Sequence, residues 1–294
     1  MRGRHSLAAW TFAGPALVML GLFFFVPVIL AFALSLTNFD LYSLADFGNT
    51  DFVGFANYAE LVRTPLFWKA LGNTLYFVIV GVPLSIAVSL GAALLLHAGV
   101  SRLTGLFRTA LFAPVVTTLV AVAMIWRYLL HTRYGFINYV LAQLGVDPVD
   151  WLGDPNWSMP AIIFFAVWKN FGYNMVILLA GLQAIPGELY EAARIDGANG
   201  WQRFRHVTLP SLGPMLLLVS ILTMAGYFQL FAEPYVMTQG GPVESTVSVL
   251  YFMYDQGFKW WNLGFASAVA FALFLIMVVF TALQYRFARA RGMA

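Results

Sequence analysis

The chain has no cysteine, and few of its residues carry a charge. Without cysteine it can form no disulfide, no thiolate metal site and no cysteine nucleophile. Only 10% of its 294 residues are charged, whereas 61% are hydrophobic; ordinary soluble domains carry about a quarter charged residues. A water-soluble core could not bury this much apolar surface, so the composition predicts an integral membrane protein.

Long stretches with almost no Asp, Glu, Lys or Arg divide the chain into candidate spans. A transmembrane helix needs about 20 mainly apolar residues, and six windows qualify. None of them alternates apolar and polar residues as a barrel strand does. The sequence therefore predicts an all-α membrane protein with six transmembrane helices, near residues 9–36, 70–97, 107–130, 159–183, 211–236 and 263–286.

The first window follows a basic start, MRGRH, and its Ala31-Phe32-Ala33 resembles a signal-peptidase site. The apolar region of a signal peptide has about 7–15 residues, and this one is about twice as long. We therefore expect an uncleaved first helix rather than a signal peptide.

Basic residues give the expected orientation, because they concentrate on the cytoplasmic side of a membrane. With both termini in the cytoplasm, ten of the sixteen basic residues lie inside, but only three of the thirteen acidic ones. Trp157, Trp260 and Trp261 then fall at the outer boundary, where tryptophan is enriched. We expect three parts: residues 1–69 (N-terminus, first helix and an outer loop ending in an interfacial helix), residues 70–287 (five further helices) and a cytoplasmic basic tail, 288–294.

Polar side chains that interrupt the fourth and fifth predicted spans are costly and need a reason. Lys169 lies near mid-depth, so it is functional, reaches outward to the headgroups, or pairs with Glu233. Amides, phenols and a carboxylate lining one cavity suit a polyhydroxylated solute, but such groups also join membrane helices by hydrogen bonds. Both interpretations stay open for the candidate solute path, which is Lys169, Asn170, Tyr173, Asn174, Tyr227, Gln229 and Glu233.

No motif for catalysis or metal binding stands out. His97, His131 and His206 lack metal-ligand spacing, and the glycine-rich residues 238–242, TQGGP, lack the lysine of a phosphate loop. The sequence therefore predicts no catalytic residue, no metal site and no cofactor bound by this chain.

Residues 188–210, ELYEAARIDGANGWQRFRHVTLP, form a charged segment between two apolar spans. Glu188 and Glu191 are favourable near a helix N-terminus, and Gly197 can take the left-handed conformation that ends a helix. A second short helix then presents Trp201 and Phe204 on one side. The pattern predicts two short helices joined by a glycine turn, which either dock on another protein or rest on lipid headgroups.

This segment resembles the EAA loop of permease subunits of binding-protein-dependent ABC importers. The matching residues, with Trp201 and Phe204 as anchors, are Glu191, Ala192, Ala193, Asp196, Gly197, Ala198, Trp201, Phe204, Val207, Leu209 and Pro210. Valine at 207 replaces the commoner isoleucine. The resemblance implies a type I ABC importer (MetI/MalF-like) permease fold, with cytoplasmic coupling helices that fit a cleft on an ATPase.

Three further stretches, residues 52–77, 168–186 and 231–242, resemble the MalF-like sugar permeases of the carbohydrate-uptake branch. The resemblance implies a bacterial or archaeal cytoplasmic membrane and import of a sugar-like solute by alternating access. It also implies a MalG-like second permease, two cytoplasmic ATPases that carry ATP and Mg²⁺, and an external solute-binding protein, with no nucleic acid. This subunit would itself be non-catalytic. The alternative is an ion-coupled secondary transporter or channel, which often shows inverted repeats or intramembrane acids.

Overall fold

The computed structural model describes residues 2–99 and 103–290, with side chains from Trp10 onward. Apart from one isolated bridge between Thr37 and Phe52, these ranges contain helices, turns and loops but no strand. The helices are α1 (Arg2–Leu20), α2 (Val26–Ser35), α3 (Leu41–Ala45), α4 (Ala56–Arg63), α5 (Pro65–His97), α6 (Thr104–Val116), α7 (Leu119–Leu129), α8 (Phe136–Gln143), α9 (Pro155–Gln183), α10 (Gly187–Ile195), α11 (Gly200–Arg203), α12 (Leu209–Ser211), α13 (Gly213–Phe228), α14 (Ala232–Met237), α15 (Val249–Tyr254) and α16 (Leu263–Ala290).

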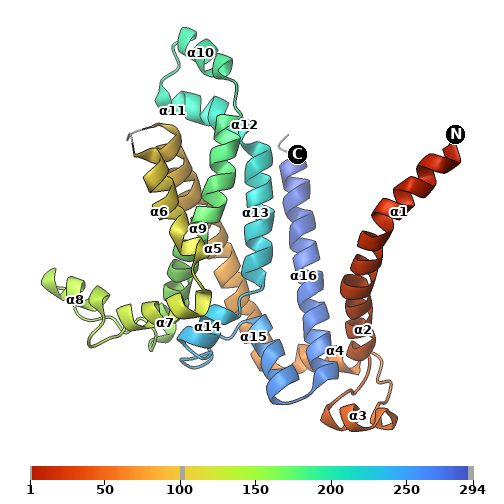
Figure 1. Cartoon of the computed structure of the whole chain (residues 1–294). Coiled ribbons are helices and arrows are strands. Elements are labelled where there is room, and N and C mark those ends of the chain that lie inside the picture. The colour runs from red at the N-terminus through yellow and green to blue at the C-terminus, as the bar shows by residue number, and fades with distance from the viewer. Residues whose placement is uncertain (1, 100–102, 291–294) are drawn as a thin grey trace. The chain divides into compact units, whose positions relative to one another are not determined.

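Four helical stretches in the described ranges are long and apolar enough to cross a membrane (Figure 1). They are Trp10–Ser35, Pro65–His97, Pro155–Gln183 and Leu263–Ala290. The number rises to six if each of two bent helix pairs counts as one span. This agrees with an all-α fold and with the first, second, fourth and sixth predicted spans.

The third predicted span, residues 107–130, is not a single helix. It consists of α6 and α7, which meet at an angle of 98° (Figure 1). Thr117 and Thr118 between them have extended backbone. Pro114 lies one turn before the break and cannot donate a backbone hydrogen bond, which weakens the helix there.

The fifth predicted span, residues 211–236, is also shorter than expected. α13 ends at Phe228, and a separate short helix, α14, begins at Ala232. The bend that leads into α13 lies at Leu212, where the helical stretch Gly200–Ser211 and α13 meet at 66°. Gln229 and Glu233 therefore do not lie on one continuous helix with Tyr227.

The described residues divide into two compact units, of which the first comprises residues 1–67 and 252–274. Within it, the Asn57 side chain donates hydrogen bonds to the carbonyls of Ser35 (2.9 Å) and Thr37 (2.8 Å). The expected helix in the outer loop is present as α4. By contrast, the most apolar window of Trp10–Ser35 has no buried residue within the chain.

The second unit comprises residues 68–251 and 275–294 and is built around α9. Buried side chains of α9 form a core with α5 and α13: Ala93, Leu96, Phe171, Met175, Leu178, Leu179, Leu182, Leu212 and Val219. On the side of α6, a Cβ atom at Gly172 would lie 2.6 Å from the Leu111 carbonyl oxygen. Glycine therefore allows α6 and α9 to approach closely.

Candidate functional site

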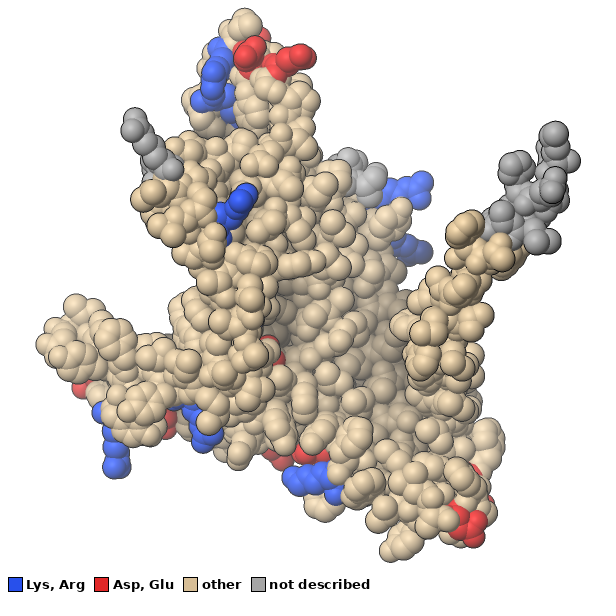
Figure 2. Space-filling model, viewed as in Figure 1, with Lys and Arg blue, Asp and Glu red and all other residues tan. Residues whose placement is uncertain are grey.

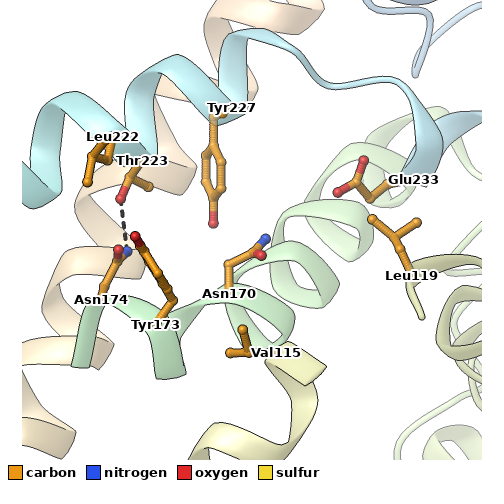
Figure 3. A pocket seen from close by; sticks show the side chains of 10 residues that line it. Val115, Leu119, Asn170, Tyr173, Asn174, Leu222, Thr223, Tyr227 and Glu233 are labelled. Atoms are coloured by element: carbon orange, nitrogen blue, oxygen red, sulfur yellow. Dashed lines mark hydrogen bonds between the residues drawn. The ribbon is translucent and has the colours of Figure 1, made fainter. Parts of the chain in front are cut away.

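A cavity of about 320 Å³ lies where α9 faces the break between α6 and α7 and the break between α13 and α14 (Figure 3). Its walls come from α6, α7, α9, α13 and α14. The lining residues are Val115, Leu119, Asn170, Tyr173, Asn174, Leu222, Thr223, Gly226, Tyr227 and Glu233. Five of the seven residues predicted for the solute path therefore lie on one cavity, although they come from three different helices.

Two asparagines one turn apart on α9 differ in what they bind. The Asn174 amide donates to the Thr223 hydroxyl of α13 (2.8 Å) and to the Ser85 hydroxyl of α5 (3.4 Å). Asn170 donates to the carbonyl of Ala166 in its own helix (3.0 Å). Asn174 thus joins three helices. The hydrogen bond of Asn170 lies within α9, and Asn170 lies at the cavity wall.

Tyr227 reaches across from α13, with its hydroxyl directed toward Asn170 (Figure 3). The ring is 5% exposed and packs on Phe77, with ring centroids 4.8 Å apart. The Ser85 hydroxyl lies near the Tyr227 hydroxyl, but in the described chain no group meets hydrogen-bond geometry with it. A buried hydroxyl gains free energy from a hydrogen-bond partner, so Tyr227 is a candidate for a solute contact.

Glu233 supplies the only charged side chain among the ten lining residues. It lies in the first turn of α14, a helix that packs against α7 and α9. A carboxylate near a helix N-terminus is favoured by the helix dipole. The cavity wall is therefore polar on the α9 and α14 sides and carries one acid.

Lys169 lies behind the cavity wall rather than on it. Its side chain is 6% exposed, and its Nζ donates a hydrogen bond to the carbonyl of Val115 (3.0 Å). Val115 is the penultimate residue of α6, and the last carbonyls of a helix lack intrahelical donors. Lys169 thus caps the broken end of α6, as basic side chains do at helix C-termini. It interacts electrostatically with Glu233, without a salt bridge within 4.0 Å in the described residues.

Gln229 is not among the lining residues, because α13 ends just before it and its side chain is exposed. Five residues that line the cavity were not predicted for the solute path: Val115, Leu119, Leu222, Thr223 and Gly226. Thr223 could have been found, since it precedes Tyr227 by one helical turn. The positions of Val115 and Leu119 depend on the break between α6 and α7, which hydropathy does not reveal.

The segment of residues 188–210, which we call the coupling segment after the role that its resemblance implies, folds into two short helices as predicted. α10 ends in a Schellman motif: the Ala198 amide donates to Ala193 (2.9 Å) and the Gly197 amide to Arg194 (3.0 Å). Gly197 has a φ of 78°, the left-handed conformation expected for it. This turn therefore ends α10 and leads the chain into α11.

The second half of the coupling segment has its own cap. The side chains of Asn199 and Gln202 form a capping box at the start of α11, and helix continues as a π-helical turn, Phe204–Thr208. The Tyr190 and Thr208 hydroxyls lie 3.0 Å apart and tie the two halves together. The segment is thus held in shape by its own side chains.

Apolar side chains of the coupling segment nevertheless point away from this chain. Ile195 is 87% exposed, Trp201 67% and Leu189 46%. The other predicted residues range from half-buried (Ala193, Ala198, Phe204 and Val207) to exposed (Glu191, Ala192, Asp196, Gly197, Leu209 and Pro210). Figure 2 shows both signs of charge gathered over α10 and α11. Exposed apolar groups with charged neighbours are typical of a surface that contacts another protein or a membrane.

Comparison with known proteins agrees with this arrangement. The family described as binding-protein-dependent transport system inner membrane component matches residues 97–292. The chain is 35% identical over 292 residues to the lactose transport system permease protein LacF of Rhizobium radiobacter, covering 98% of this chain and 96% of that one. It is 34% identical over 285 residues to the sulfoquinovosyl glycerol transport system permease protein SmoG of Agrobacterium fabrum, covering 97% and 91%.

A solved structure shows the same fold. A chain of a bacterial ABC transporter involved in the import of the acidic polysaccharide alginate matches with a TM-score of 0.80 and 21% identity. The match covers 98% of this chain and 96% of that chain. The chain belongs to the family of binding-protein-dependent transport system inner membrane components, and it is a multi-pass permease subunit of an ABC importer with the type I fold.

Proposed function

We propose that this permease subunit moves a sugar or sugar-like solute by alternating access, and that its coupling segment transmits the movement of a separate ATPase. The observation that carries the coupling role is the coupling segment itself: its two halves are capped and joined by hydrogen bonds of their own, yet it exposes Ile195 and Trp201. A rigid element can pass on a displacement without absorbing it.

The sugar assignment draws on the relatives and on the cavity. A relative 35% identical is named for lactose transport, and the cavity offers amide, phenol and carboxylate groups that bind hydroxyls directionally. The candidate solute contacts are Asn170, Tyr173, Tyr227 and Glu233. Lys169 and Asn174 hold the walls in place.

The proposed assembly has four kinds of component. This chain pairs with a second permease in a heterodimer, two ATPases dock on the coupling segments, and an external binding protein delivers the solute. A similar solved transporter forms a complex with an alginate pentasaccharide-bound periplasmic protein. ATP and Mg²⁺ bind to the ATPases, and this chain is non-catalytic.

The proposed location is a bacterial or archaeal cytoplasmic membrane, with both termini and the coupling segment inside. Ten of the sixteen basic residues then lie on the cytoplasmic side, in agreement with the positive-inside rule. In this orientation the coupling segment faces the compartment that contains ATP.

Co-purification tests the proposal directly. The chain, expressed with the proteins encoded beside it and extracted in mild detergent, should bring down an ATPase subunit. Glu191→Arg and Gly197→Asp should lower solute uptake while membrane insertion is retained. Absence of any ATPase, or normal uptake by both variants in an intact complex, would refute the coupling role and favour a transporter that acts alone.

A further inference from the structure

A second hollow, a groove of about 630 Å³, lies between α5 and α6 and shares no lining residue with the cavity at α9. Thr104 is the only one of its nine lining residues with a polar side chain. The lining residues are Val88, Gly91, Ala92, Leu95, Leu96, Thr104, Phe107, Leu111 and Phe171. The groove can therefore hold an apolar group, and a hydroxyl-rich solute would gain little there.

Both walls of the groove are joined to α9. The Ser89 hydroxyl of α5 donates a hydrogen bond to the Phe171 carbonyl of α9 (3.0 Å). On the other side, α6 approaches α9 closely at Gly172. The Phe171 side chain, which is 8% exposed, lines the groove between the two walls. The groove is thus set by contacts of α5 and α6 with a common third helix.

The groove runs along α5 for about the depth of one leaflet. The α5 lining residues recur at the spacing of a single helical face. From Val88 to Leu96 they extend over about 12 Å, and half of the hydrocarbon thickness is about 15 Å. Because α5 ends at His97, the groove starts at the end of the span and leads toward the membrane centre. An acyl chain in that leaflet follows the same direction over the same depth.

A basic side chain lies beside the headgroup end of this groove. Arg108 is four residues after Thr104 and three before Leu111, so it flanks the lining face of α6. It is exposed, and among the described residues it forms no salt bridge within 4.0 Å. It lies about 6 Å along α6 from the first residue, a depth from which arginine can reach the headgroups. No Asp or Glu occurs in residues 61–146.

We propose that this groove binds an anionic phospholipid of the cytoplasmic leaflet, with an acyl chain along α5 and the phosphate on the Arg108 guanidinium. Basic sites between helices on the cytoplasmic side suit anionic headgroups, and guanidinium matches the geometry of phosphate. The proposal rests on the proposed function only for the leaflet, through the orientation of the chain. It does not depend on the solute or on its path.

Photocrosslinking in the complete importer identifies the occupant. Leu95, which lines the groove and is 68% exposed, is replaced by p-benzoylphenylalanine. The complex is reconstituted in equal amounts of phosphatidylglycerol and phosphatidylcholine, irradiated and analysed by mass spectrometry. We expect about fivefold more crosslinked phosphatidylglycerol than phosphatidylcholine, which corresponds to about 1 kcal/mol for one basic residue. Equal amounts of the two lipids, or a crosslink to the second permease instead of lipid, would overturn the proposal.

Two variants test the headgroup and the acyl chain separately. Arg108→Gln should remove the preference for phosphatidylglycerol, whereas Arg289→Gln, at an exposed arginine in the last turn of α16, should keep it. Gly91→Phe fills the groove, because a Cβ atom there meets no atom within 4 Å, and should reduce crosslinking to both lipids. Gly105→Phe, at an equally open glycine of α6 outside the lining, is the control.

A preference that survives Arg108→Gln, or lipid crosslinking that is equal in Gly91→Phe and Gly105→Phe, would contradict the proposed site. ATPase co-purification is measured on the same samples and tests the coupling role separately, because none of these four positions belongs to the coupling segment. An importer that retains the ATPase but shows no lipid preference would therefore refute this site alone.

Discussion

The coupling segment and the cavity are held in shape by opposite means. In the coupling segment the stabilising bonds are local, as in the Schellman motif at Gly197 and the capping box of Asn199 and Gln202. In the cavity they connect distant parts of the chain: Lys169 reaches Val115 across 54 positions, and Asn174 reaches Thr223 across 49. One region keeps its shape by itself, whereas the other has a shape only while its helices stay together.

This difference suits the two proposed roles. A surface that transmits movement must stay rigid while it is displaced as a body, and local caps provide that. A cavity that alternates between two sides of a membrane must change shape when helices move. Because its shape depends on hydrogen bonds between helices, a change in the helix arrangement also changes the cavity. Variants in the two regions should therefore fail in different ways.

The largest expected effect is on docking. Ile195→Asp removes an exposed apolar side chain and should cost no packing within this chain, because Ile195 is 87% exposed. We expect docking to weaken about thirtyfold, which corresponds to a loss of about 2 kcal/mol, a value typical of interface hot spots. ATPase co-purification and solute uptake measure it.

Leu144→Asp is the matched control, because Leu144 is 73% exposed and lies outside the coupling segment. It should retain the ATPase. Equal retention in both variants would show that Ile195 takes no part in docking.

A smaller effect, on stability, is expected at the cavity wall. Lys169→Met leaves the Val115 carbonyl without its donor and should lower the free energy of unfolding by about 2 kcal/mol, the cost of a buried unsatisfied group. Thermal unfolding of the purified chain in detergent measures it. Lys259→Met, at an exposed lysine 4.0 Å from Asp255, should cost less than about 0.5 kcal/mol. Equal losses in the two variants would refute the capping role of Lys169.

Variants of the two asparagines of α9 should distinguish a residue that holds the cavity wall from a residue that contacts the solute. Asn174→Ala removes hydrogen bonds to α13 and α5 and should destabilise the chain by about 1 kcal/mol. Asn170→Ala should lower uptake in a complex of unchanged stability, because its recorded bond lies within α9. Thermal unfolding and uptake are measured on both. If Asn170→Ala only destabilised the complex, Asn170 would have a structural role like that of Asn174 and would not contact the solute.

The smallest expected effect is at the turn of the coupling segment. Gly197→Ala has room for its Cβ, but an L-residue with a φ of 78° is disfavoured by about 1 kcal/mol. Hydrogen exchange at the amide of Ala198 should accelerate. Gly187→Ala, at an open position in the first turn of α10, is the control and should not accelerate it. Unchanged exchange in Gly197→Ala would mean that alanine takes the left-handed conformation at this position without a measurable cost.

The comparison also explains what the sequence could predict. The coupling segment was predictable because its signals are local: Gly197 ends one helix. Asn199 and Gln202, three positions apart, mark the start of the next and were visible but unused. The cavity was only partly predictable, since helical spacing grouped Asn170, Tyr173 and Asn174 but could not place them against α13 and α14.

The two predicted spans that are not single helices have a common cause. Hydropathy depends on composition, and a bend leaves composition unchanged, so 107–130 and 211–236 each looked like one helix. Pro114 and Pro234 lie beside the breaks and were the available warning. Lys169 shows the same limit, because its role depends on the broken end of α6, where it donates a hydrogen bond to the Val115 carbonyl.

The break between α6 and α7 has a consequence for the solvent around it. With 13 residues, α6 is about 20 Å long, whereas the hydrocarbon layer is about 30 Å thick. α7 turns away by 98° and adds little to that depth. Non-helical backbone at membrane depth is tolerated only against protein or water, so we expect protein or water, and not lipid, around the extended residues Thr117 and Thr118. By itself, α6 is therefore too short to cross the hydrocarbon layer along its own axis.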